Sequence, residues 1–167
     1  MQLTHRRIGD EAAREPLYTA EQRRRRDMSR WTLVQGILAP LQFLIFFVSL
    51  GLVLRFLATG EGAFAADVSV VAKTLALYTI MVTGAIWEKV VFGRYLFAPA
   101  FWWEDAVSMA VIALHTLYLV MLFGGFGSVE ARMAVALAAY TTYVLNAGQF
   151  LLKLRRARLE PAMVATA

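Results

Sequence analysis

The sequence predicts an all-α, polytopic membrane protein in which four transmembrane helices form an up-down bundle. Of its 167 residues, 59% are hydrophobic, whereas soluble domains contain roughly 45–50% apolar residues. The mean hydropathy is +0.57. Four apolar runs each reach the roughly 20 residues that a helix needs to cross a bilayer. These runs are Trp31–Leu57, Val68–Val91, Ala106–Phe126 and Val129–Leu152.

Positive charge gathers at both ends of the chain and in the turn between the second and third runs. The net charge is +5, yet no Lys or Arg lies within residues 59–72 or 124–131, where the other two turns fall. The positive-inside rule therefore predicts that both termini and the turn over residues 89–105 face the cytoplasm. In a chain with four membrane spans, arginines at the span ends are expected to contact anionic lipids. We therefore expect no nucleic-acid partner.

The chain divides into three expected parts. Residues 1–30 form a basic N-terminal segment, in which Thr19 followed by Glu21 and Gln22 predicts a short surface helix over Thr19–Arg30. Residues 31–153 hold the four spans, and residues 154–167 form a basic C-terminal tail. Arginines of such a surface helix suit phosphate headgroups.

The first run carries Gln35, Gln42 and Ser49 at a spacing of seven residues, which places all three on one helix face. Buried amides in a membrane seek partners on other helices. Two interpretations follow: the three side chains bond neighbouring helices together, or they form a polar strip that lines a cavity.

The second run contains Lys73 near one end and Glu88 near the other. A lysine close to the end of a span usually extends its amine to the interface, and we expect Lys73 to do so.

The third and fourth runs also carry polar faces. Helical spacing places Glu104, Ser108, Val111 and His115 on one face. The helical rise puts His115 about 16 Å deeper than Glu104, near mid-membrane. The face of the fourth run comprises Tyr143, Asn146, Gln149 and Lys153.

The turn from Ile86 to Asp105 is the strongest candidate site. It reads I-W-E-K-V-V-F-G-R-Y-L-F-A-P-A-F-W-W-E-D, with three carboxylates, two cations and seven aromatic residues. Carboxylates next to lipid cost free energy and indicate function by default. In an up-down bundle the ends of the second and third spans meet here, so we expect Glu88, Glu104 and Asp105 to converge.

Converging carboxylates can perform acid–base chemistry, because repulsion in a poorly solvated site favours one of them keeping its proton. The protonated group is then a general acid and an ionised neighbour is a general base. A purely structural interpretation stays open: Glu88 pairs with Lys89 or Arg94, while Glu104 and Asp105 stabilise the start of a helix.

The aromatic residues of the turn have two interpretations as well. Aromatic side chains form interfacial belts in many membrane proteins, but their density here also suits a platform for a large, flat, apolar ligand. Lys89 or Arg94 can hold an anionic group of such a ligand. The aromatic residues are Trp87, Phe92, Tyr95, Phe97, Phe101, Trp102 and Trp103.

Several classes of chemistry have no motif in this chain. Because there is no cysteine, disulfides, thiolate nucleophiles and cysteine-ligated metals are excluded. The sequence contains no P-loop, G-x-G-x-x-G, G-x-S-x-G or H-E-x-x-H pattern, so we predict no metal site. His115 is either a buried structural histidine, an axial contact to a chlorin magnesium or part of a proton relay.

The runs Arg23–Leu44, Leu54–Gly62, Tyr78–Asp105 and Val107–Leu119 resemble the 3-vinyl (also written 2-vinyl) bacteriochlorophyllide hydratase family. The resemblance extends over about residues 18–156 and is most specific between Tyr78 and Asp105. It implies a bacterial inner-membrane enzyme of bacteriochlorophyll synthesis, a hydro-lyase. Such an enzyme adds water to the 3-vinyl group of chlorophyllide a or 3-vinyl bacteriochlorophyllide a. The product carries a 3-(1-hydroxyethyl) group.

The resemblance implies no cofactor, since the substrate carries its own magnesium. The expected partners are the tetrapyrrole substrate, membrane lipids and neighbouring enzymes of the same synthesis. We expect Glu88 or Glu104 to protonate the vinyl group and the other, or Asp105, to orient water. Replacement of Glu104 by Gln is therefore expected to abolish hydration. The expected substrate-binding residues are Gln42, Trp87, Lys89, Arg94, Tyr95, Trp102, Trp103, His115 and Asn146.

Two other functions compete with hydration. A non-catalytic protein that binds or hands over a pigment intermediate would use the same aromatics but would not need several carboxylates. A transporter would need polar residues along a path across the bilayer. The predicted topology places the ionisable residues mainly on the cytoplasmic side of the membrane, with His115 as the one deep exception. This distribution argues against a transport path across the bilayer.

Overall fold

The computed structural model describes residues 17–164, with side chains up to residue 158, and its helices are longer than the predicted spans. The described chain contains five helices: α1 (Ala20–Met28), α2 (Arg30–Thr59), α3 (Ala63–Phe92), α4 (Trp102–Gly124) and α5 (Val129–Val164). Helices α2 to α5 are each long and apolar enough to cross a membrane. The all-α class and the four spans predicted from sequence are thus confirmed.

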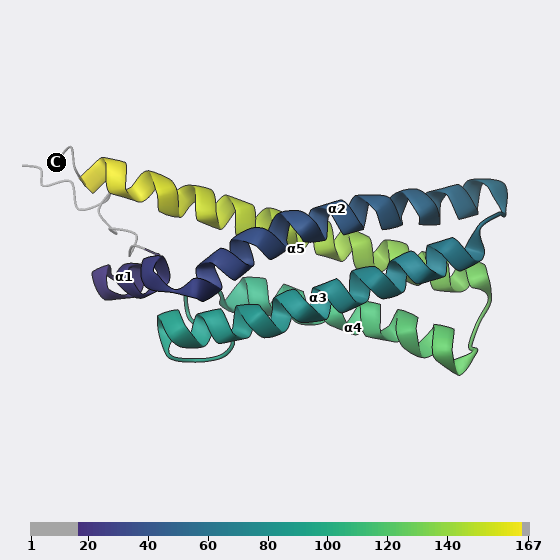
Figure 1. The fold of residues 1–167 in the computed structure, drawn as a ribbon, viewed down its shortest axis with the longest axis horizontal. Coiled ribbons are helices and arrows are strands. Elements are labelled where there is room, and N and C mark those ends of the chain that lie inside the picture. The colour runs from purple at the N-terminus through teal and green to yellow at the C-terminus, as the bar shows by residue number, and fades with distance from the viewer. Residues whose placement is uncertain (1–16, 165–167) are drawn as a thin grey trace, which may run out of the picture.

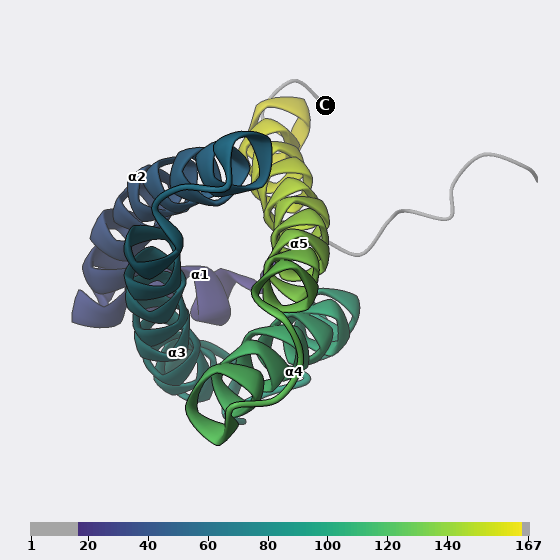
Figure 2. The same cartoon turned by 90° about the vertical axis from the view of Figure 1, so that its right-hand side faces the viewer.

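The four long helices run up and down along one axis (Figure 1). Viewed from the end, they form a ring in the order α2, α3, α4, α5 (Figure 2). Helix α2 packs closely along α3 and α4 along α5, whereas contacts between these two hairpins are fewer. The bundle therefore consists of two tight helical hairpins that meet along a looser seam.

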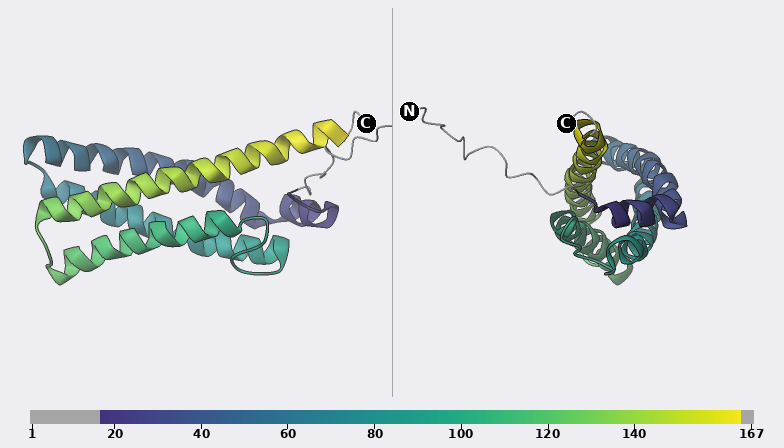
Figure 3. Two further views of the ribbon diagram at one scale, coloured as in Figure 1. Left: turned by 180° about the vertical axis from the view of Figure 1, so that it is seen from behind. Right: turned by 90° about the vertical axis from the view of Figure 1, so that its left-hand side faces the viewer.

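The short helix α1 lies beside the end where α3 turns into α4, together with the far end of α5 (Figure 3). We call this the α3–α4 end. Thr19 and Gln22 form a capping box at the start of α1, so the predicted start of this helix is confirmed. Tyr18 stacks on Phe92 at a ring distance of 5.7 Å, which fastens α1 to the bundle.

Glycines allow the sharp chain reversals between the spans. Gly60 follows the last residue of α2 and Gly93 follows the last residue of α3, with φ of 74° and 85°. Residues with a Cβ rarely adopt this left-handed conformation. The turn after Gly93 brings the end of α3 next to the start of α4, and this juxtaposition creates the candidate site.

The polar face of α2 bonds neighbouring helices together. Gln35 donates to Thr83 Oγ1 at 2.8 Å, and Gln42 donates to the carbonyl of Ala76 at 3.1 Å. Ser49 lies 2.5 Å from the hydroxyl of Tyr140. The interpretation as interhelical bonding is therefore confirmed for all three polar positions of the first span.

Candidate functional site

The three carboxylates of the turn converge at the α3–α4 end, as the sequence predicted. Glu88 lies near the end of α3, and Glu104 and Asp105 lie in the first turn of α4. Their exposed fractions are 5%, 6% and 3%. Three acids withdrawn from solvent at one place require compensating partners or shared protons.

Backbone amides of the turn bond two of these acids. Ala98 N–H donates to Glu88 Oε2 at 3.2 Å, and Phe97 N–H donates to Asp105 Oδ2 at 2.7 Å. Phe97 adopts a positive φ of 57°, which is strained for a residue with a bulky side chain. The bond to Asp105 helps to hold this strained backbone in place.

The carboxyl groups of Glu88 and Asp105 also lie within hydrogen-bonding reach of each other. A hydrogen bond between two carboxyl groups needs a proton, because two carboxylates are both acceptors. Like charges at this separation in a buried site cannot both ionise easily. The arrangement therefore suits a carboxyl–carboxylate pair that shares one proton.

Glu104 has a different environment, because α5 supplies a cation. Lys153 Nζ lies 2.5 Å from Glu104 Oε2. The same amine donates to the carbonyl of Ala100 and lies 4.9 Å from the centre of the Phe101 ring. Sequence reasoning placed Lys153 on the polar face of the fourth span but did not assign it to the site.

The alternative in which Glu88 pairs with Lys89 or Arg94 is wrong for the described structure. Lys89 is exposed and donates to the carbonyl of Gly93 at 2.8 Å. Its amine lies 5.4 Å from the centre of the Tyr95 ring. Arg94 is exposed as well. Both cations are available at the surface of the turn and are not used to neutralise Glu88.

The aromatic residues of the turn separate into an inner and an outer group. Trp87 and Phe92 pack edge to face on Phe101 at ring distances of 5.7 Å each, and the Trp87 indole donates to Thr32. This inner group packs together at the α3–α4 end. The outer group is exposed, at 48% to 69%, and consists of Tyr95, Trp102 and Trp103.

A second polar cluster lies in the interior, away from the turn. Lys73 is fully buried and donates to Gln42 Oε1. Its amine lies 3.7 Å from the centre of the Tyr143 ring. The expectation that Lys73 extends to the interface is wrong, because Gln42 and Tyr143 bind the amine inside the bundle. Ionisable groups therefore lie deeper than the sequence indicated.

His115 and Asn146 belong to the same interior. His115 is fully buried and its Nδ1 lies 2.8 Å from the carbonyl of Val111. Asn146 donates to Ser108 Oγ at 2.7 Å. His115 Nε2 and Asn146 Oδ1 have no hydrogen-bond partner within the described part of the chain. Eleven residues of α4 separate His115 from Glu104, or about 16 Å.

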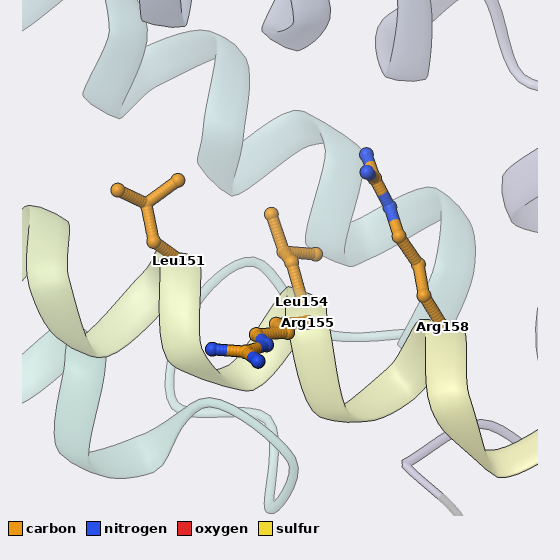
Figure 4. A pocket seen from close by; sticks show the side chains of 4 residues that line it. All are labelled: Leu151, Leu154, Arg155 and Arg158. Atoms are coloured by element: carbon orange, nitrogen blue, oxygen red, sulfur yellow. The ribbon is translucent and has the colours of Figure 1, made fainter.

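A shallow pocket of about 380 Å³ lies on the outer surface of α5 (Figure 4). Its lining residues are Leu151, Leu154, Arg155 and Arg158. Arg155 and Arg158 are exposed and contribute nothing to the buried acids. Leucines beside arginines at the end of a span match the boundary between lipid tails and headgroups.

The fold and the buried acids define a multi-pass membrane protein with an acid-rich site at one end of its bundle. Residues 18–156 match the model of the family described as 2-vinyl bacteriochlorophyllide hydratase, and the chain belongs to this family.

Two curated relatives carry the same name. The relative from Cereibacter sphaeroides is 71% identical over 86% of this chain and 89% of its own length. The relative from Rhodobacter capsulatus is 68% identical over 90% of this chain and 87% of its own length. No solved structure matches. The resemblance noted in the sequence is confirmed.

Proposed function

We propose that this chain is a hydro-lyase that adds water to the vinyl group of a chlorophyllide-type tetrapyrrole in bacteriochlorophyll synthesis. Two independent supports are the family membership and the similarity to relatives named 2-vinyl bacteriochlorophyllide hydratase. The observation that carries the mechanism is the contact between the buried carboxyl groups of Glu88 and Asp105.

The reaction needs one proton donor and one proton acceptor. The carboxylic acid of the Glu88–Asp105 pair gives its proton to the terminal vinyl carbon, and the adjacent carbon becomes a cation conjugated with the macrocycle. Water oxygen bonds to that carbon and its proton passes to the carboxylate of the pair. The pair again holds one proton, so the cycle closes without an added cofactor. The only metal in this scheme is the magnesium of the substrate.

Glu104 has a supporting role in this proposal. Its carboxylate is held by Lys153 at 2.5 Å and lies in the same helical turn as Asp105. A fixed negative charge next to a developing cation stabilises the transition state in a water-poor site. Glu104 thus acts electrostatically, while Glu88 and Asp105 exchange protons.

The outer aromatic residues receive the macrocycle. Trp102 and Trp103 are exposed at the start of α4, two residues and one residue before Glu104. Their ring centres lie 4.9 Å apart with the ring planes at 88°, so the exposed face of either indole can stack on a flat pigment. Lys89, Arg94 and Tyr95 are also exposed at the α3–α4 end, where they can contact the edge of the pigment.

We also propose that the α3–α4 end faces the cytoplasm of a bacterial inner membrane. The arginines of α1 lie at this end. Arg155 and Arg158 belong to the last part of α5, which lies at the same end. This is the distribution expected of cytoplasmic segments. The substrate and product would exchange with neighbouring enzymes of the same synthesis through the bilayer.

The test is a reaction of membranes that contain the protein with chlorophyllide a and no added cofactor. We expect the pigment to gain the mass of one water and its absorption to shift to the blue, because vinyl conjugation is lost. Membranes without the protein are the control. Pigment that is retained by the protein without a change in mass would contradict hydration and indicate a binding or handover protein.

A further inference from the structure

We propose that Lys73 binds the carboxylate of the substrate's propionate arm inside the bundle. This inference rests on the proposed function for the identity of the ligand, and it assigns a substrate-binding role to a residue that sequence reasoning placed at the interface.

Two groups of the bundle contact the amine of Lys73. The amine faces a carbonyl oxygen of Gln42 and the ring face of Tyr143. An oxygen acceptor and the negative face of an aromatic ring both attract an ammonium group. Gln42 is held in this orientation because its own amide donates to the carbonyl of Ala76 at 3.1 Å.

The amine of Lys73 has no anionic partner in the described structure. The described ion pairs involve Glu21, Asp27, Asp67 and Glu104, and none of them includes Lys73. An ammonium group that is fully buried inside a membrane bundle is costly unless it is paired. A lysine has three donor hydrogens, and an anionic ligand would satisfy the amine where the protein does not.

A second observation shows that this interior is incomplete. His115 Nε2 and Asn146 Oδ1 are buried without partners in the described chain, although buried polar atoms are nearly always bonded. They lie on α4 and α5, across the bundle from α2 and α3. The interior around Lys73 thus has the unsatisfied polar atoms expected of a site that a ligand completes.

The distance along the bundle suits the proposed ligand. On α5, Tyr143 contacts Lys73 and Lys153 contacts Glu104. Tyr143 and Lys153 are ten residues apart, which corresponds to about 15 Å along the helix. The propionate and the vinyl group of the substrate belong to different pyrrole rings. A macrocycle with an extended propionate arm can therefore reach Lys73 while its vinyl group stays near the acids.

The same geometry places the magnesium of the substrate away from His115. His115 lies about 16 Å along α4 from Glu104, whereas the magnesium is at the centre of the ring that bears the vinyl group. A vinyl group near the acids is thus incompatible with an axial bond from His115. The looser seam between the two hairpins is the route by which a flat pigment would enter from the bilayer.

The experiment compares chlorophyllide a with its propionate methyl ester, using pigment fluorescence to measure binding to the purified protein in lipid nanodiscs. We expect the natural protein to bind the acid at least about tenfold more tightly than the ester, as for a desolvated charge pair. Lys73→Met should remove this preference by weakening acid binding while ester binding stays unchanged. Lys73→Arg should restore part of the preference.

Arg55→Met is the matched control, since Arg55 is an exposed cation of α2, and we expect it to keep the full preference for the acid. Loss of the preference in Arg94→Met, with its retention in Lys73→Met, would overturn the inference and place the propionate at the surface of the turn. Equal binding of acid and ester by the natural protein would overturn it as well.

The failure of this inference is distinguishable from failure of the proposed function. Hydration of the methyl ester, measured as a gain of one water, tests the acid pair without any contribution from a propionate charge. Hydration without a preference for the acid contradicts only the role of Lys73. A preference for the acid without hydration contradicts only the proposed reaction.

Discussion

The two ends of the bundle both bury acidic side chains, but they balance the charge differently. At the end opposite the turn, Asp67 pairs with Arg132 at 3.2 Å and accepts a bond from the Tyr118 hydroxyl. At that end, one acid therefore interacts with one cation and one phenol hydroxyl. At the α3–α4 end, Glu88, Glu104 and Asp105 are all buried, but the ion pairs of the described residues include only Glu104, which pairs with Lys153.

This difference separates an acid that supports the fold from acids that suit chemistry. The carboxylate of Asp67 has a dedicated arginine, and their ion pair connects α3 to α5. Two neighbouring buried carboxyl groups favour retention of one proton between them, and the proposed reaction uses that proton. The excess of acids over cations therefore marks the reactive end.

The largest expected effect concerns the acid pair. Glu88→Gln or Asp105→Asn should lower the hydration rate by about 10²–10⁴-fold, the usual contribution of a positioned general acid or base. Each amide keeps an oxygen that can accept the backbone bond from Ala98 or Phe97, so the fold is preserved. Mass analysis of the pigment measures the rate, and turnover near the natural rate in both variants would refute the acid pair.

Replacement of Lys153, the cation that pairs with Glu104, should have a smaller effect on the hydration rate. Lys153→Met leaves Glu104 without its partner, and breaking a buried pair costs about 3 kcal/mol. We expect a lower midpoint of thermal unfolding and roughly a tenfold slower reaction, since that is the effect of about 1.4 kcal/mol on a barrier. Glu104→Gln combined with Lys153→Met should recover stability but not rate. Recovery of the rate in the double variant would show that the charge of Glu104 has no catalytic part.

The opposite end provides the contrasting case. Asp67→Asn should destabilise the protein by roughly 1–3 kcal/mol, because Arg132 and Tyr118 lose a charged acceptor. The hydration rate per folded molecule should stay unchanged. Thermal unfolding and the pigment assay on the same sample measure both quantities. A rate that falls as far as in Asp105→Asn would remove the distinction between the two ends.

The smallest effect is expected in the middle of the bundle. Ser49→Ala removes contacts of 2.5 Å to Tyr140 and 2.7 Å to Ser69. Interhelical hydrogen bonds in membranes contribute about 0.6 kcal/mol each on average, so the loss of stability should be near 1 kcal/mol. Unfolding in mixed detergent micelles can measure it. A loss as large as that of Asp67→Asn would show that bonds within the interior, and not the end pairs, dominate stability.

Much of the candidate site could be predicted because it lies in one short stretch of sequence. Glu88 and the Glu104–Asp105 pair flank a turn, and the turn length alone forces the two helix ends together. The same local reasoning placed Glu104, Ser108 and His115 on one buried face, and all three are buried.

Lys153 and Lys73 show where local reasoning ends. Lys153 reaches Glu104 across a sequence separation of 49 residues, and the helical pattern of α5 indicates a polar face but not its partner. Lys73 lies ten residues after the start of α3. The length of a lysine side chain would by itself allow the amine to reach the membrane interface. Only the packing of Gln42 and Tyr143 around its amine draws it into the interior.

The sequence by itself determined the class of protein, the four spans and the position of the turn, because apolar length and helical periodicity are local properties of the chain. Tertiary structure alone decided how charge is balanced. The assignment of one cation to Glu104, the contact between Glu88 and Asp105 and the burial of Lys73 all depend on which helices are neighbours. Electrostatic energies fall with distance across the bundle. The distances between helices depend on how the helices pack and cannot be derived from the sequence of any single helix.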